Sequence, residues 1–114
     1  MNKYGAKKIT VKGEKFDSKK EYNRYVELCL LERAGKISGL KRQVRYMLTP
    51  AQYDKNGVCF LRSSTYVADF VYKNQAGELV VEDVKGYKKG DAYRLFVQKK
   101  KDMYDRYQIL VVET

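Results

Sequence analysis

Three residues in an acidic stretch of an otherwise basic chain could bind a metal ion and act on a phosphate. Residues 66–83 contain four acids and one base, whereas the whole chain carries 24 Lys+Arg and 14 Asp+Glu. Asp69 and Asp83 lie in this stretch, and Lys85 follows two residues after it. Carboxylate oxygens are the hard ligands that Mg²⁺ prefers, and a nearby lysine can orient a water molecule or stabilise charge on a phosphate. The residue types therefore indicate metal-dependent phosphate chemistry, provided that the fold brings them together.

Two predicted strands, over residues 65–73 and 78–85, bring the aspartates together. Both segments are rich in β-branched and aromatic residues. Gly77 between them can supply the positive φ that a three-residue hairpin loop needs. With this loop length, Asp69 pairs directly with Asp83.

A four-residue loop would instead pair Asp69 with Glu82 and leave Asp69 diagonal to Asp83. Side chains alternate along a strand, so Asp83 and Lys85 share a face in either register. Like charges directly opposite one another destabilise paired strands. The other side chains expected on this face are apolar, namely Val67, Val71, Leu79 and Val81. Protonation, Lys85 or a bound cation must then relieve the repulsion.

The charge of the chain predicts a polyanionic partner. We expect a single domain over residues 1–114, with a formal net charge of +10 and 11 tyrosines. The bases gather in residues 1–20, which include a basic arm or small hairpin at about 1–15, and in residues 85–101. Positive charge can also serve solubility alone. Its concentration on both sides of the acidic stretch favours nucleic acid.

Several classes of protein are excluded by composition. The chain has no histidine, which excludes histidine-based zinc sites, Ser-His-Asp catalysis and Cys-His nucleophiles. Cys29 and Cys59 are too far apart in sequence to form a metal-ligand cluster, and so few cysteines are typical of a reducing cytoplasm. We find no Gly-rich phosphate loop, signal peptide or membrane-spanning apolar run. We therefore expect a soluble cytoplasmic protein without a small-molecule cofactor.

Turn and capping signals divide the chain into a helix, three strands, a helix and a strand. Ser18 and Glu21 fit a capping box, and Gly35 can end the first helix. Asp91 can cap the second helix, in whose apolar face Lys100 is the odd member. The expected elements are a helix over 18–34, a strand over 43–48, a loop or hairpin over 53–64, the two strands above, a helix from 91 to about 107 and a strand over 109–112 covered on both faces. The last strand should run parallel after a right-handed crossover, which gives an α/β fold with a mixed sheet flanked by helices.

Three segments carry a resemblance to a known family. Residues 16–21 (FDSKKE), 66–70 (YVADF) and 81–86 (VEDVKG) resemble those of small phage-encoded endonuclease-like proteins. Together with the element order, they resemble the PD-(D/E)xK nuclease superfamily from about Phe16 onward. The layout is also similar to archaeal Holliday-junction resolvases and to the nuclease subunit of a bacterial transposase. One departure is Ala68, which precedes Asp69 where the family pattern has proline.

The resemblance implies a restriction-endonuclease-like core that hydrolyses phosphodiester bonds with Mg²⁺ or Mn²⁺. On this basis Asp69 and Asp83 are metal ligands, the backbone carbonyl of Val84 could add another, and Lys85 acts on the attacking water or the phosphate. The resemblance also implies that Glu21 is a direct or water-mediated ligand. Glu21 can equally serve only in the capping box, and both roles stay open.

The expected function is that of a metal-dependent DNA endonuclease acting on branched or duplex DNA. Lys88 and Lys89 lie in a glycine-flanked loop beside Lys85 and should contact phosphates. The second helix could add contacts from Arg94, Gln98, Lys100 and Lys101, although the stem of Lys100 could simply snorkel to solvent. Symmetrical cutting needs two sites, so we expect a homodimer. The alternatives are a non-catalytic nucleic-acid-binding phage protein on the same fold and a phage protein that binds a host protein.

Overall fold

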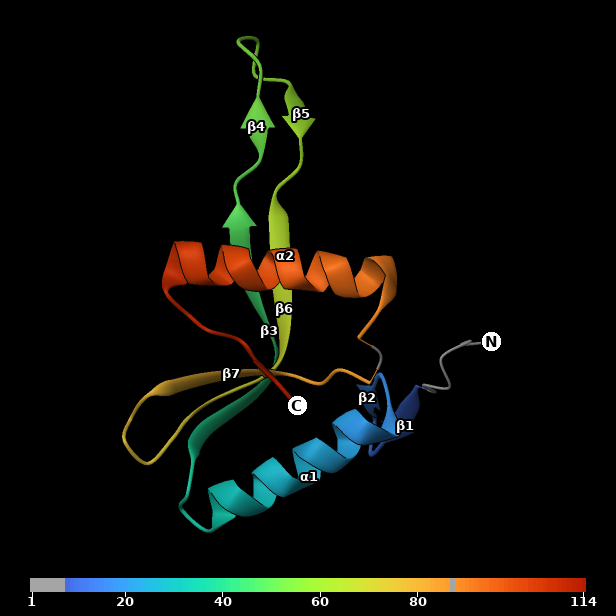
Figure 1. Ribbon diagram of the computed structural model, residues 1–114, viewed down its shortest axis with the longest axis vertical. Coiled ribbons are helices and arrows are strands. Elements are labelled where there is room, and N and C mark those ends of the chain that lie inside the picture. Colours follow the sequence, from blue (N-terminus) through green and yellow to red (C-terminus); the bar gives the residue numbers. More distant parts are fainter. Residues whose placement is uncertain (1–7, 87) are drawn as a thin grey trace.

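The computed structural model describes residues 8–86 and 88–114 (Figure 1). Two helices, α1 (Lys19–Arg33) and α2 (Gly90–Tyr107), flank one sheet made of β3 (Ser38–Thr49), β6 (Ser64–Lys73), β7 (Leu79–Asp83) and β8 (Val112–Glu113). Two hairpins complete the fold, β1 (Ile9–Val11) with β2 (Glu14–Phe16) and β4 (Gln52–Tyr53) with β5 (Cys59–Leu61). No helix in the described residues combines the length and the apolar character needed to cross a membrane.

The four-stranded sheet is mixed, as the sequence predicted. Its order is β3-β6-β7-β8, with β6 antiparallel to both β3 and β7, and with β8 parallel to β7. α2 connects β7 to β8 and crosses β3 and β6 (Figure 1). Val81 belongs to the core that contains Phe96 of α2, whereas the next residue, Glu82, binds Arg24 of α1. The two helices therefore cover opposite faces of β7, and the mixed α/β architecture is confirmed.

The β6–β7 hairpin has the register predicted from a three-residue loop. Tyr72 pairs with Val80, and the loop closes between Asn74 and Glu78, where Asn74 N donates to Glu78 O at 3.0 Å. Gly77 has a φ of +80°, which side chains other than glycine rarely adopt. The four-residue alternative is thereby excluded. The last pair of the ladder is Phe70 with Glu82, and one further step sets Asp69 opposite Asp83.

Several local expectations need correction. α2 has Lys89 at its N-cap, with no side-chain hydrogen bond to cap it, and Asp91 instead pairs with Arg94 at 2.8 Å. The last strand is shorter than predicted and begins later, at Val112, and Leu110 lies before it and is 67% exposed. On the face of the acids, Val71 and Val81 are buried but Val67 and Leu79 are exposed. For the N-terminal segment, by contrast, the small hairpin is the predicted alternative that the structure shows, over residues 9–16, while residues 1–7 lie outside the described residues.

The alternation of side chains is interrupted at the centre of the sheet. Ala68 belongs to the core beside α2, but Phe70, two residues later on β6, belongs to the core beside α1. On β3, Leu40 packs against the α1 core and Val44 against the α2 core. An uninterrupted strand keeps residues of equal parity on one face. The break lies between these residues, where Gln43 of β3 has a φ of +52° and faces Asp69 of β6.

Candidate active site

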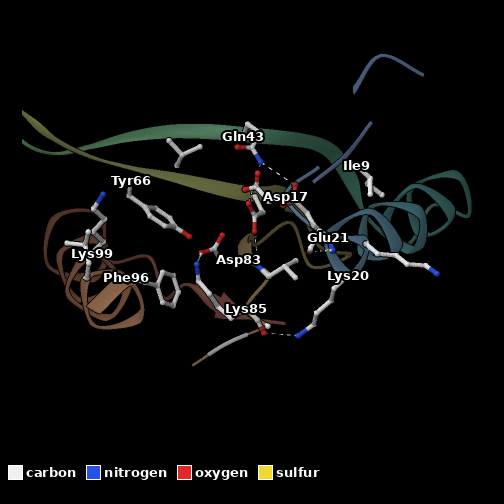
Figure 2. Close-up of a pocket in the computed structure, with 18 of the residues that line it drawn as sticks. Ile9, Asp17, Lys20, Glu21, Gln43, Tyr66, Asp83, Lys85, Phe96 and Lys99 are labelled. Atoms are coloured by element: carbon white, nitrogen blue, oxygen red, sulfur yellow. Dashed lines mark hydrogen bonds and ion pairs between the residues drawn. The ribbon is translucent and has the colours of Figure 1, made fainter. Parts of the chain in front are cut away.

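The predicted site residues meet in a cleft of ≈ 1150 Å³ (Figure 2). Its walls come from α1, β6, β7 and α2, and from the segments that join them. All residues predicted for the metal ion and the chemistry line it, namely Glu21, Asp69, Asp83, Val84 and Lys85. The interrupted centre of the sheet and the first turns of both helices therefore lie around the same cleft.

The two aspartates are buried, and their charge is relieved in two ways. Asp83 is 4% exposed, and its Oδ2 lies 2.8 Å from Nζ of Lys85. Asp69 is 9% exposed, and its Oδ2 accepts a hydrogen bond of 2.8 Å from the backbone N of Val84. Burial, a hydrogen bond with Asp83 and the charge of Asp83 raise the pKa of Asp69 to about 7. The structure thus contains two of the three expected means of relief, the ammonium group of Lys85 and a raised pKa of Asp69 that favours its protonated form.

The structure separates the two roles of Glu21. Its backbone N donates to Oγ of Ser18 at 3.1 Å, so the peptide takes part in the cap. Its carboxylate is 2% exposed and accepts hydrogen bonds from Arg42 Nη2 at 3.3 Å and Gln43 Nε2 at 3.5 Å. Burial first, and then the charge of Asp69, raise the pKa of Glu21. The side chain is thus turned toward the sheet and the other acids instead of back to the helix terminus.

Gln43 is a site residue that sequence reasoning missed. Its Nε2 donates to Glu21 Oε2 and, at 3.4 Å, to Asp69 Oδ1, so one amide connects α1 and β6. A non-glycine residue with positive φ inside a strand is strained, and such strain persists only where the surroundings hold it. Nothing in the sequence signals this conformation, because a glutamine in a strand is ordinary. The strained backbone turns the amide toward the acids.

Cations surround the acids, and only one of them was predicted. Lys20 donates from Nζ to the backbone O of Lys85 at 2.8 Å, and Lys19 and Lys99 also line the cleft. Nζ of Lys85 lies 4.1 Å from the centroid of the Phe96 ring and makes a cation–π contact with it. The sequence signal for Lys19 and Lys20 was their position in the first turn of α1, next to Glu21.

The residues predicted to contact DNA lie outside the lining of this cleft. Lys100 makes an ion pair with Glu113 at 3.0 Å, and Lys88 approaches the same carboxylate at 3.8 Å. Lys100 therefore ties α2 to β8. Arg94 pairs with Asp91 on the surface of α2. Lys89 and Lys101 are exposed.

The acids suit a divalent cation only in part as they stand. In residues 8–86 and 88–114, no group of three or more His, Cys, Asp or Glu side chains is arranged to hold a metal ion. Glu21 is bonded to Arg42 and Gln43, and Lys85 is bonded to Asp83. The oxygen-only donors and the raised pKa of Asp69 fit a hard cation, which would replace the proton between the acids. Asp83 could serve such a cation as a ligand only if Lys85 no longer paired with it.

The raised pKa of Asp69 predicts how stability depends on pH. Its pKa is about 7 in the fold, against an ordinary value of 3.8. The fold binds the Asp69 proton more tightly than the unfolded chain does, and this preference stabilises the fold fully below about pH 4. As the pH rises from about 4 to about 7, the free energy of unfolding should fall by up to about 4 kcal/mol. Urea unfolding in EDTA across this range should show the loss in the wild-type protein and a flatter profile for Asp69→Asn. Parallel profiles for the two proteins would contradict the assignment.

Comparison with known proteins assigns a family. The family model described as Protein of unknown function (DUF1064) matches residues 1–113. No curated protein and no solved structure matches the chain. Because the match covers nearly the whole sequence, this protein belongs to the DUF1064 family.

Proposed function

We propose that this protein is a metal-dependent DNA endonuclease with a restriction-endonuclease-like core. The observation that carries the proposal is the pair of buried carboxylates, Asp69 and Asp83, on adjacent strands beside one lysine, Lys85. One ammonium group cannot pair with both carboxylates, so one of the two acids must be held neutral by a proton unless a cation binds beside it. Two buried acids that share one ammonium group in a cleft are therefore suited to a divalent cation.

Each residue of the centre has a role that follows from its chemistry. Asp69 and Asp83 would hold Mg²⁺ or Mn²⁺, with the Val84 carbonyl and Glu21 as the further oxygen donors. When bound, the ion polarises the scissile phosphate and lowers the pKa of a water molecule. Lys85, released from Asp83, orients that water or stabilises the charge that develops on the phosphate. In this proposal the acids bind the metal ion, and the lysine acts on the water or the phosphate.

DNA is the proposed substrate because of the charge around the cleft. Lys19, Lys20 and Lys99 line it, and the chain as a whole carries +10. Such a surface attracts phosphate backbones irrespective of sequence. Structure-selective cleavage of branched DNA requires two incisions, so the proposal includes a homodimer.

A cleavage assay tests this proposal directly. Labelled four-way junction, flap, single-stranded and linear duplex DNA would each be incubated with the full-length protein in Mg²⁺, Mn²⁺ or EDTA. We expect cleavage with either metal ion, the highest kcat/KM on a branched substrate, and no cleavage in EDTA. DNA binding without cleavage under every metal condition would contradict an endonuclease.

A non-catalytic DNA-binding protein is the second candidate, and one observation favours it. The ion pair between Lys85 and Asp83 at 2.8 Å neutralises one of the two acids without a metal ion. In such a protein the acids would be structural, and Mn²⁺ would neither bind nor raise the melting temperature. Isothermal titration with Mn²⁺ therefore distinguishes the two candidates without reference to cleavage.

Glu21→Gln is expected to lower the cleavage rate by about 10- to 100-fold with little change in melting temperature. The cap is retained because Ser18 bonds the backbone N of residue 21 and not its side chain. The substitution removes a charge that would face the cation. Glu27→Gln, on the exposed face of the same helix, is the matched control and should be fully active. Full activity of Glu21→Gln would mean that the Glu21 carboxylate only packs against Arg42 and Gln43 and does not face the cation.

Replacing Lys88 and Lys89 together with alanine should weaken binding to every DNA of a given structure by a similar factor. Both lysines are exposed and lie a few residues after Lys85. The slope of log affinity against log salt should become shallower by up to about two units if both touch phosphate. The charge-matched control is Lys36→Ala/Lys73→Ala, which removes two exposed lysines that do not line the cleft. Equal slopes for the wild-type protein and the Lys88/Lys89 variant would mean that this loop does not contact the DNA backbone.

A further inference from the structure

Tyr66 is a buried tyrosine whose hydroxyl group has no hydrogen-bond partner. It lies on β6, is 4% exposed, and its hydroxyl oxygen is buried and unpaired in the described residues. Its side chain lines the cleft, and in Figure 2 the hydroxyl group points toward Asp83 and Lys85. The hydroxyl group thus lies near the Asp83 carboxylate and is turned toward it, but it makes no hydrogen bond of normal geometry with it.

An unpaired buried hydroxyl group destabilises a protein, because the group loses its bonds to water and gains none in return. Tyr72, six residues further along the same strand, shows the usual arrangement. It is 8% exposed, and its hydroxyl group donates to Glu82 on the opposite face of β7. Phenylalanine would fill the space of Tyr66 and keep the ring contact with Phe96, at 6.3 Å between centroids. The hydroxyl group at position 66 therefore points to a partner that the free protein does not provide.

The proposed reaction creates a need for such a donor. Lys85 now donates to Asp83 Oδ2 at 2.8 Å, and Asp83 is 4% exposed. When Lys85 turns to the water or the phosphate, this oxygen loses its donor in a place that solvent hardly reaches. A buried carboxylate oxygen without a hydrogen-bond donor destabilises the site, and the carboxylate group can then rotate. Tyr66 is the unpaired donor on that side of the cleft.

We propose, on the basis of the function proposed above, that Tyr66 is a positioning residue whose hydroxyl group donates to Asp83 once Lys85 has left it. The bond holds the carboxylate in the orientation that binds the cation. Groups that orient metal ligands typically change metal affinity or activity by about 10- to 100-fold when they are removed. The Tyr66 hydroxyl group is then unpaired while Lys85 holds Asp83, and it bonds Asp83 when the cation is bound.

Tyr66→Phe and Tyr72→Phe form a matched pair, since each removes one buried hydroxyl group from β6. Tyr66→Phe should melt in EDTA at the same temperature as the wild-type protein or higher. It should bind Mn²⁺ about 10- to 100-fold more weakly and show a lower kcat, with an unchanged KM for DNA. Tyr72→Phe should melt at a lower temperature, because Glu82 loses a donor, and keep wild-type Mn²⁺ affinity and kcat.

Each other outcome overturns the inference in a recognisable way. A lower melting temperature for Tyr66→Phe would show that the hydroxyl group is already paired in the free protein. Unchanged Mn²⁺ affinity and kcat would show that it does not act on Asp83, while the endonuclease proposal stands. A raised KM with unchanged Mn²⁺ affinity would place the hydroxyl group on the DNA phosphate. A wild-type protein that neither binds Mn²⁺ nor cleaves DNA would remove the proposed function itself and this inference with it.

Discussion

Asp83→Asn is expected to reduce metal-dependent cleavage by at least about a thousandfold while the protein remains folded. The substitution preserves the shape of the side chain but removes one of the two charges that would hold the cation. A loss of about 4 kcal/mol of transition-state stabilisation corresponds to this factor. The same change relieves the repulsion between Asp69 and Asp83, so the melting temperature in EDTA should stay the same or rise.

The measurements are kcat with saturating DNA, Mn²⁺ affinity and the melting temperature in EDTA. Asp105→Asn is the control, because Asp105 is an exposed aspartate on α2 that does not line the cleft. It removes the same charge from the chain and should leave all three quantities unchanged. Undiminished cleavage by folded Asp83→Asn would show that the cleft acids are not the reaction centre.

Arg24→Met is expected to destabilise the fold by about 3–5 kcal/mol, the largest effect on stability that we predict. Glu82 is 1% exposed, and Arg24 binds both of its oxygens, from Nε at 2.8 Å and from Nη2 at 2.7 Å. Tyr72 donates to the same carboxylate. Removal of the guanidinium group leaves a buried negative charge with only a hydroxyl donor.

Denaturant unfolding at neutral pH measures this effect. Arg33→Met, in the exposed last turn of α1, should change the free energy of unfolding by less than about 0.5 kcal/mol. Replacing both partners, as Arg24→Met with Glu82→Met, should recover most of the loss because no unpaired charge remains. If the single and double variants were equally destabilised, the loss would come from packing of the arginine stem and not from the buried charge.

The sequence by itself determined the features that depend on neighbouring residues. Gly77 and the length of its loop fixed the β6–β7 register, and alternation then placed Asp83 with Lys85 and set Asp69 opposite. Ser18 fixed the start of α1 through a hydrogen bond to a residue three positions away. These interactions act over a few residues, so their geometry follows from local chemistry. For that reason the core of the candidate site and the mixed α/β class could be predicted.

Only the tertiary structure decided which partners the polar side chains take. Glu21 fits a capping box by sequence, yet its carboxylate is bonded to Arg42 and Gln43, more than twenty residues away. Lys100, the odd member of an apolar helix face by sequence, takes Glu113 of β8 as its partner. These choices depend on how the helices pack across the interrupted sheet, where the competing interactions differ little in free energy. The packing of the helices and the sheet, and not the local preference of glutamine, holds Gln43 at a positive φ. The local sequence therefore does not predict this conformation.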